Sequence, residues 1–214
     1  MSCCCATDGT QRFFNTQAHR LERYFRRKGL RPEQKYLMEG LQQSGMKQAS
    51  ILDIGCGVGG LHLSLLQAGA QRAAGFDISE KMIRAAHKLS SEMGLSERTQ
   101  YWQGDFIEIS AQAPTADITI LDKVFCCYEN FEELIARSAA KTKRLYAVSY
   151  PRENYVARFV FCAGAFLFKL WRTSFHPYYH PPTRIQAAIQ GQGFDKTFER
   201  FTMIWAVQVF QRSS

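Results

Sequence analysis

The 214-residue sequence lacks a secretory signal and any apolar run long enough to cross a bilayer. An apolar run at residues 159–168 is too short for a membrane span, and Arg158 and Lys169 flank it directly. Internal repeats and low-complexity blocks are also missing. Since 46% of the residues are hydrophobic and 21% are charged, as in ordinary globular proteins, we expect a folded cytoplasmic protein rather than a disordered chain.

The cysteines lack the even number and the spacing of a disulfide framework. The seven are Cys3, Cys4, Cys5, Cys56, Cys126, Cys127 and Cys162. Their odd number and adjacent positions indicate a reducing compartment. The first three lack C-x-x-C spacing and have no nearby histidine to complete a zinc set, so we expect no metal site. Metal binding by these three is the alternative to an unstructured, reduced tail.

Acidic residues are outnumbered, and the resulting net charge of +8 is concentrated near the N-terminus. Residues 12–35 contain eight lysines and arginines against only Glu22 and Glu33. Such a segment suits an anionic partner or a solvated helix face. Because nucleic acid would be recognised here by charge alone, we do not expect it as the partner.

The same segment has an apolar stripe. Phe14, Leu21 and Phe25 recur at helical spacing, which predicts an amphipathic helix over residues 11–29 after a flexible tail at residues 1–10. The helix either packs on the core with its charges in water, covers a ligand site and contacts an anionic acceptor, or lies on a membrane surface. The arginines expected at such an acceptor are Arg23, Arg26 and Arg27.

A glycine-dense turn at residues 51–60 is the most informative motif. An apolar strand leads into it, and an amphipathic helix follows. Glycine lets the backbone approach a ligand closely, and the helix start offers free N–H groups. Gly55, Gly57 and Gly60 fit the dinucleotide pattern G-x-G-x-x-G. Gly55, Gly57 and Gly59 also fit the pattern G-x-G-x-G, whose first glycine lies two residues after an acid, Asp53.

Further strands are predicted to end in acids. Residues 73–77 end in Asp77, residues 101–105 in Gly-Asp, and residues 116–122 in Asp122. Strand and helix alternate up to Pro151, and this alternation predicts a doubly wound parallel sheet. In such sheets ligands bind at the carboxyl ends of the strands.

Residues 50–149 therefore resemble the class I S-adenosylmethionine (SAM) methyltransferases. The resemblance implies an α/β fold with a doubly wound, mostly parallel, seven-stranded Rossmann-like sheet, and SAM as the cofactor. A nicotinamide-dependent oxidoreductase is the alternative, because Asp77 lies about twenty residues past the glycines. It explains Gly104-Asp105 less well and leaves little chain for a substrate domain. A non-catalytic binding protein with this fold is a third interpretation.

The resemblance also implies the cofactor contacts. Asp77 would accept hydrogen bonds from the ribose hydroxyls, Ile78 would pack on the adenine and Asp105 would accept from the adenine amino group. Asp122 and Lys123 would face the sulfonium and the acceptor. The complete expected set is Asp53, Gly55, Gly57, Gly59, Asp77, Ile78, Asp105, Phe106, Asp122 and Lys123.

A general base is needed only if the acceptor is protonated at neutral pH. The candidates for catalysis are Tyr128, His176 and His180, with Glu129 as a further candidate base. For each histidine, a structural hydrogen-bonding role is the alternative. An acceptor that is already an ionised carboxylate would need no base.

The sequence after Pro151 is rich in aromatic residues and predicts an apolar helical insert on the substrate side, followed by a closing helix and two strands. A dimer interface or plain core is the alternative for this insert. We expect one domain, residues 1–214, in four parts: a tail and helical arm at residues 1–48, a SAM-binding core at 49–151, the aromatic insert at 152–182 and the closing elements at 183–214.

Within the methyltransferases, the chain resembles the magnesium-protoporphyrin O-methyltransferases and small bacterial relatives. Residues 13–15, the basic stretch at residues 20–29 and the insert at residues 155–171 carry this looser resemblance. It implies a small or medium-sized acceptor that is flat or apolar, with a carboxylate or hydroxyl as the methylated group. An RNA-directed methyltransferase is an alternative, although residues 122–125 lack the Pro-Pro pair typical of nucleic-acid N-methylation.

Overall fold

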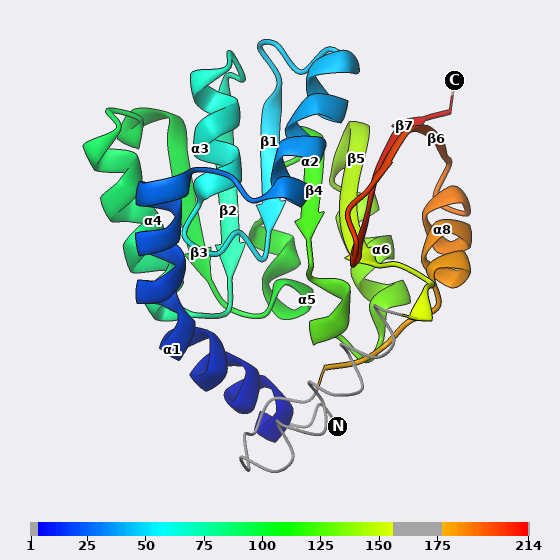
Figure 1. Cartoon of the computed structure of the whole chain (residues 1–214), viewed down its shortest axis with the longest axis horizontal. Coiled ribbons are helices and arrows are strands. Elements are labelled where there is room, and N and C mark those ends of the chain that lie inside the picture. The colour runs from blue at the N-terminus through cyan, green and yellow to red at the C-terminus, as the bar shows by residue number, and fades with distance from the viewer. Residues whose placement is uncertain (1–3, 156–176, 214) are drawn as a thin grey trace.

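Seven strands form one continuous sheet at the centre of the protein. The computed structural model describes residues 4–155 and 177–213 (Figure 1). The strands are β1 (Ser50–Ile54), β2 (Arg72–Asp77), β3 (Thr99–Gln103), β4 (Ala116–Asp122), β5 (Thr142–Pro151), β6 (Phe194–Phe201) and β7 (Trp205–Arg212). They lie in the order β3-β2-β1-β4-β5-β7-β6; the first five are parallel, and β7 pairs antiparallel with both β5 and β6. The predicted seven-stranded, mostly parallel sheet is confirmed.

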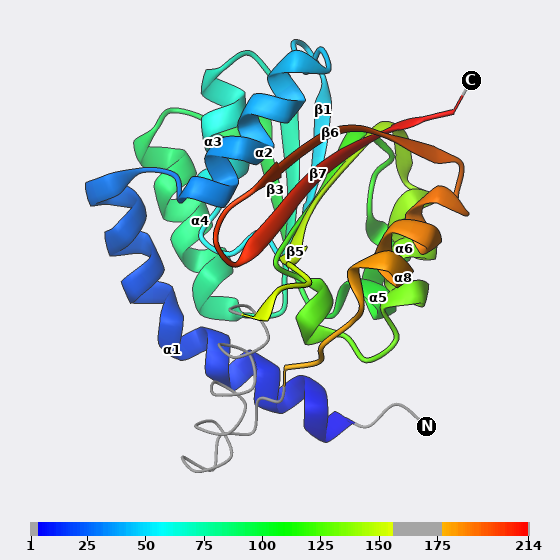
Figure 2. The same ribbon diagram turned by 45° about the vertical axis from the view of Figure 1, so that its right-hand side comes forward.

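Helices cover both faces of the sheet (Figures 1 and 2). They are α1 (Cys4–Lys28), α2 (Pro32–Gln43), α3 (Gly60–Gln67), α4 (Glu80–Glu92), α5 (Phe106–Ile109), α6 (Phe131–Ala139) and α8 (Pro182–Gln190). The buried side chains of α2, α3 and α4 belong to one apolar core, and those of α5, α6 and α8 belong to a second core on the opposite face. Both cores bury β-sheet side chains, because parallel strands are covered on both sides.

The close packing of α2 on the sheet depends on Gly40. A Cβ atom at this position would lie 2.6 Å from the ring of Phe198 and 2.8 Å from Val209. Glycine therefore lets the helix backbone rest directly on the antiparallel pair β6–β7. The first turn of α2 lies beside the carboxyl end of β4, where the Gln34 side chain donates a hydrogen bond to Asp122.

The N-terminal helix is longer than the sequence predicts. It begins at Cys4, so the expected flexible tail over residues 1–10 is wrong for all but the first residues, which lie outside the described part of the chain. The proposed aromatic insert also falls mainly on residues outside the described part, 156–176. Among the described helices, none is long and apolar enough to cross a membrane.

Candidate cofactor and acceptor site

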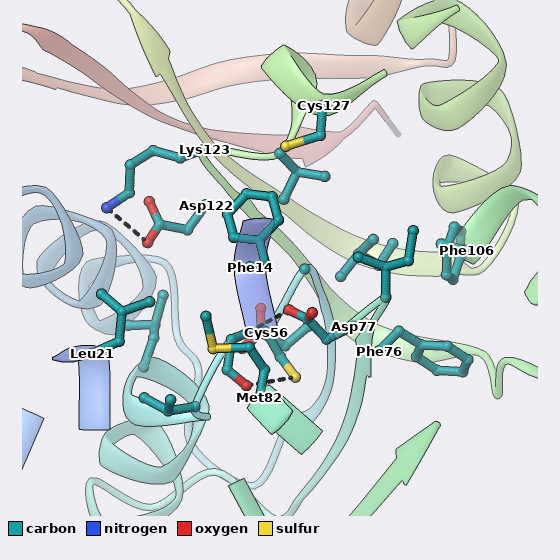
Figure 3. A pocket seen from close by; sticks show the side chains of 18 of the residues that line it. Phe14, Leu21, Cys56, Phe76, Asp77, Met82, Phe106, Asp122, Lys123 and Cys127 are labelled. Atoms are coloured by element: carbon teal, nitrogen blue, oxygen red, sulfur yellow. Dashed lines mark hydrogen bonds and ion pairs between the residues drawn. The ribbon is translucent and has the colours of Figure 1, made fainter. Parts of the chain in front are cut away.

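A cavity of about 540 Å³ lies at the carboxyl ends of β1, β2 and β4, where open α/β sheets bind their ligands (Figure 3). Its volume is in the range that holds a drug-sized ligand. Nine of the ten expected cofactor residues line it: Asp53, Gly55, Gly57, Asp77, Ile78, Asp105, Phe106, Asp122 and Lys123. The exception is Gly59, whose missing Cβ instead makes room for the ring of His62 at 3.0 Å.

The glycine turn opens one wall of the cavity. Gly57 has a φ of +55°, and a Cβ built on it would meet no atom within 4 Å, so its backbone faces open space. Gly55 has a φ of +66°, and its Cβ would lie 2.6 Å from Val124. Glycine is therefore required here both for the left-handed backbone and for close packing against the loop after β4.

Asp77 lies at the end of β2 and holds this turn in place. Its Oδ2 accepts a hydrogen bond from the Gly57 N–H at 2.8 Å, and its Oδ1 accepts one from the Ser79 N–H at 2.8 Å. Burial raises the pKa of Asp77 to about 6, although these two hydrogen bonds act in the opposite direction. Each carboxylate oxygen retains acceptor capacity toward the cavity, as a pair of ribose hydroxyls requires.

Asp53 supports the turn through two residues that the sequence did not indicate as part of the site, His62 and Tyr101. Its Oδ2 lies 2.7 Å from Nδ1 of His62, and Nε2 of His62 lies 3.0 Å from the Tyr101 hydroxyl. Asp53 is 2% exposed and His62 is fully buried, so this chain of polar groups satisfies itself inside the core. Burial raises the pKa of Asp53. His62 in turn packs against Gly59, so Asp53 supports the glycine turn through His62.

Asp105 caps a helix and also lines the cavity. Its Oδ1 accepts a hydrogen bond from the Ile107 N–H at 2.9 Å, which caps the N-terminus of α5, and another from the Tyr128 hydroxyl at 3.0 Å. Burial, together with the neighbouring Asp105, raises the pKa of Tyr128 well above its usual value. A phenol that donates to Asp105 and keeps its proton has the geometry of a positioning residue, so a general-base role for Tyr128 has no support from this structure.

Of the two candidate histidines, His180 lies in the described structure. Nε2 of His180 lies 2.7 Å from the backbone oxygen of Tyr128, and its ring packs 4.4 Å from that of Phe131. Because Nε2 donates to this carbonyl, His180 acts as the structural hydrogen-bonding residue that was the alternative interpretation. His176 lies outside the described residues. Glu129 lines the cavity.

A polar cluster forms where β4 meets the start of α2. Nζ of Lys123 lies 2.6 Å from Oε1 of Glu33 and 3.6 Å from Oδ2 of Asp122 (Figure 3 shows the second pair). The carboxylate of Asp122 also accepts hydrogen bonds from the Gln34 side chain at 2.9 Å and from the Ser149 hydroxyl. Lys123 has a φ of +62°, a strained conformation for a non-glycine residue that these contacts stabilise.

Helix α1 forms another wall of the cavity. Phe14, Leu21 and Phe25 line the cavity from this helix, and Figure 3 shows Phe14 between the Asp122–Lys123 side and the Asp77 side. The helix is fastened to α4: the Asn15 side-chain oxygen accepts hydrogen bonds from the Ser79 hydroxyl at 2.7 Å and the Lys81 N–H at 3.1 Å. The expectation that the amphipathic helix covers the site is therefore supported, and its apolar stripe is the covering face.

The arginines of α1 point elsewhere. Arg26 forms ion pairs with Glu22 at 2.8 Å and with Glu92 of α4 at 2.6 Å. Arg23 and Arg27 are exposed and, like Arg26, are not among the residues that line the cavity. The expectation that these three arginines contact an anionic acceptor is wrong, because the apolar stripe that faces the cavity turns them outward. Arg31, just after the helix, lines the cavity instead.

Comparisons with known proteins agree with this architecture. Residues 51–145 match a methyltransferase domain family. The structure of magnesium protoporphyrin IX methyltransferase from Synechocystis PCC 6803 with bound S-adenosylhomocysteine (SAH) superimposes with a TM-score of 0.76, at 21% identity, over 95% of this chain and 98% of that chain. A putative sarcosine dimethylglycine methyltransferase from Galdieria sulphuraria superimposes with a TM-score of 0.67, at 14% identity, over 84% of this chain and 85% of that one.

Sequence relatives match over a shorter stretch. The ribosomal protein L11 methyltransferase of Haemophilus influenzae (strain PittEE) is 32% identical over 77 residues, which are 36% of this chain. That match spans about a quarter of the relative's length, 26%. The fold is thus that of the Rossmann-like methyltransferases, and residues 51–145 match a methyltransferase domain. The two structures of the magnesium protoporphyrin IX methyltransferase hold SAH and SAM, so SAM is the cofactor against which this cavity is compared.

The residues present fit that cofactor. The open backbone at Gly57 provides the cradle that a close-lying ligand needs, since a Cβ there would project into free space. The carboxylates of Asp77 and Asp105 suit a ligand that presents hydroxyl and amino donors. Ile78 provides an apolar contact in the cavity, whereas Phe106 is 1% exposed and belongs to the apolar core, where its ring contacts that of Phe76.

Proposed function

We propose that the protein transfers a methyl group from SAM to a small or medium-sized organic acceptor that is flat or apolar, with a carboxylate oxygen as the favoured nucleophile. One observation carries the proposal: a single cavity combines the polar strand ends with an aromatic wall. Phe14, Tyr24 and Phe25 of α1 and Tyr178 contribute that wall. Aromatic side chains bury a planar ligand with large apolar area and offer stacking geometry.

The cofactor and the chain divide the chemistry between them. SAM, when bound, supplies a methyl group activated by a positively charged sulfur. Asp77 and Asp105 would hold the nucleoside part, and α1 would exclude water and align the acceptor. Asp53, His62 and the glycines would keep the loop rigid beneath the methionine part.

A carboxylate acceptor is favoured because neither Tyr128 nor His180 has the contacts of a general base. The Tyr128 hydroxyl donates to Asp105, and the His180 ring contacts a backbone carbonyl. An ionised carboxylate needs no deprotonation, so alignment alone suffices for transfer. The magnesium protoporphyrin IX methyltransferase with a similar fold supports this choice.

The proposal is tested by incubating the protein with SAM labelled in its methyl group and with a metabolite extract, then treating the products with mild alkali. A methyl ester releases the label as volatile methanol, whereas methyl ethers and N-methyl groups retain it. We expect labelled methanol with the wild type and none with Asp77→Ala. Label that stays in an alkali-stable product would contradict the carboxylate assignment, and no labelled product would contradict the activity.

A further inference from the structure

Arg31 is a cation in the cavity wall that has no acidic partner within the described part of the chain. It directly precedes α2, is half-buried and lines the cavity. Its guanidinium lies 4.8 Å from the centre of the Tyr24 ring, and among the described residues no carboxylate lies within ion-pair distance of it. An arginine held against an aromatic face keeps its hydrogen-bond donors free for a ligand.

The other charged groups at this end of the cavity contact one another. The Lys123 ammonium pairs with Glu33 at 2.6 Å and lies 3.6 Å from Asp122. The Asp122 carboxylate also accepts hydrogen bonds from Gln34 and Ser149. Both carboxylates are thus occupied by other groups, and the Arg31 guanidinium, which is half-buried and forms no ion pair among the described residues, is available to an anionic ligand.

The side chain of Gln34 fixes Arg31 relative to the end of β4. The Nε2 of Gln34 donates to Oδ2 of Asp122 at 2.9 Å, and its Oε1 accepts a hydrogen bond from the backbone N–H of Arg31 at 3.1 Å. One amide group thus spans the gap between the strand and the residue before the helix. This bridge fixes the backbone of Arg31, and the Tyr24 ring lies against its guanidinium, so the side chain is pre-organised for binding.

We propose that Arg31 is the carboxylate anchor of the cavity, binding a ligand carboxylate through paired guanidinium N–H groups. Planar guanidinium and carboxylate groups match in a two-bond geometry that lysine does not reproduce. The proposal rests on the proposed function, because two molecules in that reaction carry a carboxylate: the methionine part of SAM and the favoured acceptor. The chemistry is the same for both, and the test separates them.

The first arm measures the cofactor by calorimetry. The ligands are SAH and decarboxylated SAH, which keeps the amine and lacks only the carboxylate. If the methionine carboxylate is the partner, Arg31→Gln weakens SAH binding by about 10- to 100-fold and leaves decarboxylated SAH unchanged. Arg31→Lys restores part of the SAH affinity. Lys35→Gln, the loss of an exposed charge in the first turn of α2, changes the affinity for neither ligand.

The second arm measures a planar acid on the SAH-loaded protein. The probes are protoporphyrin IX and its dimethyl ester, followed by fluorescence. If an acceptor carboxylate is the partner, Arg31→Gln weakens the acid by about tenfold or more and leaves the ester unchanged. A merely structural role for Arg31 would weaken the acid and the ester together, and likewise SAH and decarboxylated SAH.

Each result is decisive. A selective loss in either arm supports the proposal and identifies which carboxylate is bound. Equal losses within each pair, or no loss in either arm, overturn the proposal while leaving the proposed function intact if the wild type still binds SAH and transfers methyl groups. A wild type that binds no SAH would overturn the proposed function and the anchor with it.

Discussion

The ionised Asp77 carboxylate destabilises the folded protein because it is buried at the end of β2. The pKa of about 6 lies above the ordinary aspartate value of 3.8, so the native state binds the proton more tightly than the unfolded state does. Stability attributable to this group is full below pH 4 and is lost as the pH rises through 6. The cost at neutral pH is on the order of 2–3 kcal/mol. A carboxylate kept in so unfavourable a place is typical of a functional site.

The same pKa predicts how cofactor binding depends on pH. Only the ionised carboxylate accepts two hydroxyl donors, so the SAH affinity should be constant above pH 7 and fall about tenfold per pH unit below pH 6. Calorimetry across pH 5–8 measures this slope. In Asp77→Asn the affinity should be lower throughout and nearly independent of pH. Equal slopes in the two proteins would show that another group is responsible.

The ribose assignment has its own test. Asp77→Ala removes a pair of charge-assisted hydrogen bonds, so SAM and SAH should each bind more weakly by about 2–3 kcal/mol. Asp195→Ala is the matched control, because Asp195 is exposed on β6 and should leave both affinities unchanged. An Asp77→Ala variant with wild-type affinity and normal folding by circular dichroism would remove Asp77 from the cofactor site.

At the scale of elements, α1 depends on the absence of a side chain on α3. A Cβ at Gly60 would lie 2.7 Å from the Phe25 ring. Gly60→Ala should therefore push α1 away, speed tryptic cleavage at the arginines of α1 and weaken SAH binding. Gln67→Ala, at the exposed end of the same helix, should change neither property. Protection from trypsin equal to wild type in Gly60→Ala would show that α1 does not depend on this contact.

The contact of α2 with β6–β7 predicts that Gly40→Ala changes the stability of the protein in the direction opposite to that expected from helix propensity. In an exposed helix, glycine to alanine stabilises by about 1 kcal/mol. At Gly40 the new methyl group would overlap Phe198 and Val209, so Gly40→Ala should instead destabilise the protein by about 1–3 kcal/mol. Urea unfolding measures the difference, with Gln43→Ala as an exposed control on the same helix. A stabilised Gly40→Ala variant would contradict the packing described.

Local patterns were enough to predict most elements. The glycine turn between an apolar strand and a helix and the closing helix after the aromatic stretch are short-range signals, and the structure has both, the turn between β1 and α3 and the closing helix as α8. The start of α1 was missed because residues 4–10 lack the apolar spacing that marked the rest of the helix. Element boundaries of this kind follow from packing that the local sequence does not contain.

At the scale of the whole molecule, the strand ends of the site were predictable and its long-range partners were not. The acids at the ends of β2, β3 and β4 converge because parallel strands end at one edge. The pairing of His62 with Tyr101 and the bridge from Gln34 to Asp122 join residues 39 and 88 positions apart. Such pairings depend on the sheet order. Arg31 had a visible signal, a cation directly before a helix-starting proline, but the local pattern did not indicate that it faces the cavity.

The central claim is that the cavity between the glycine turn and α1 binds SAM through Asp77. Calorimetric titration of the wild type and Asp77→Ala with SAH, alongside NADH, tests it most directly. We expect saturable one-to-one binding of SAH to the wild type, affinity weakened by about 2–3 kcal/mol in Asp77→Ala, and no binding of NADH. Binding of NADH without SAH, or equal SAH binding by both proteins, would contradict it.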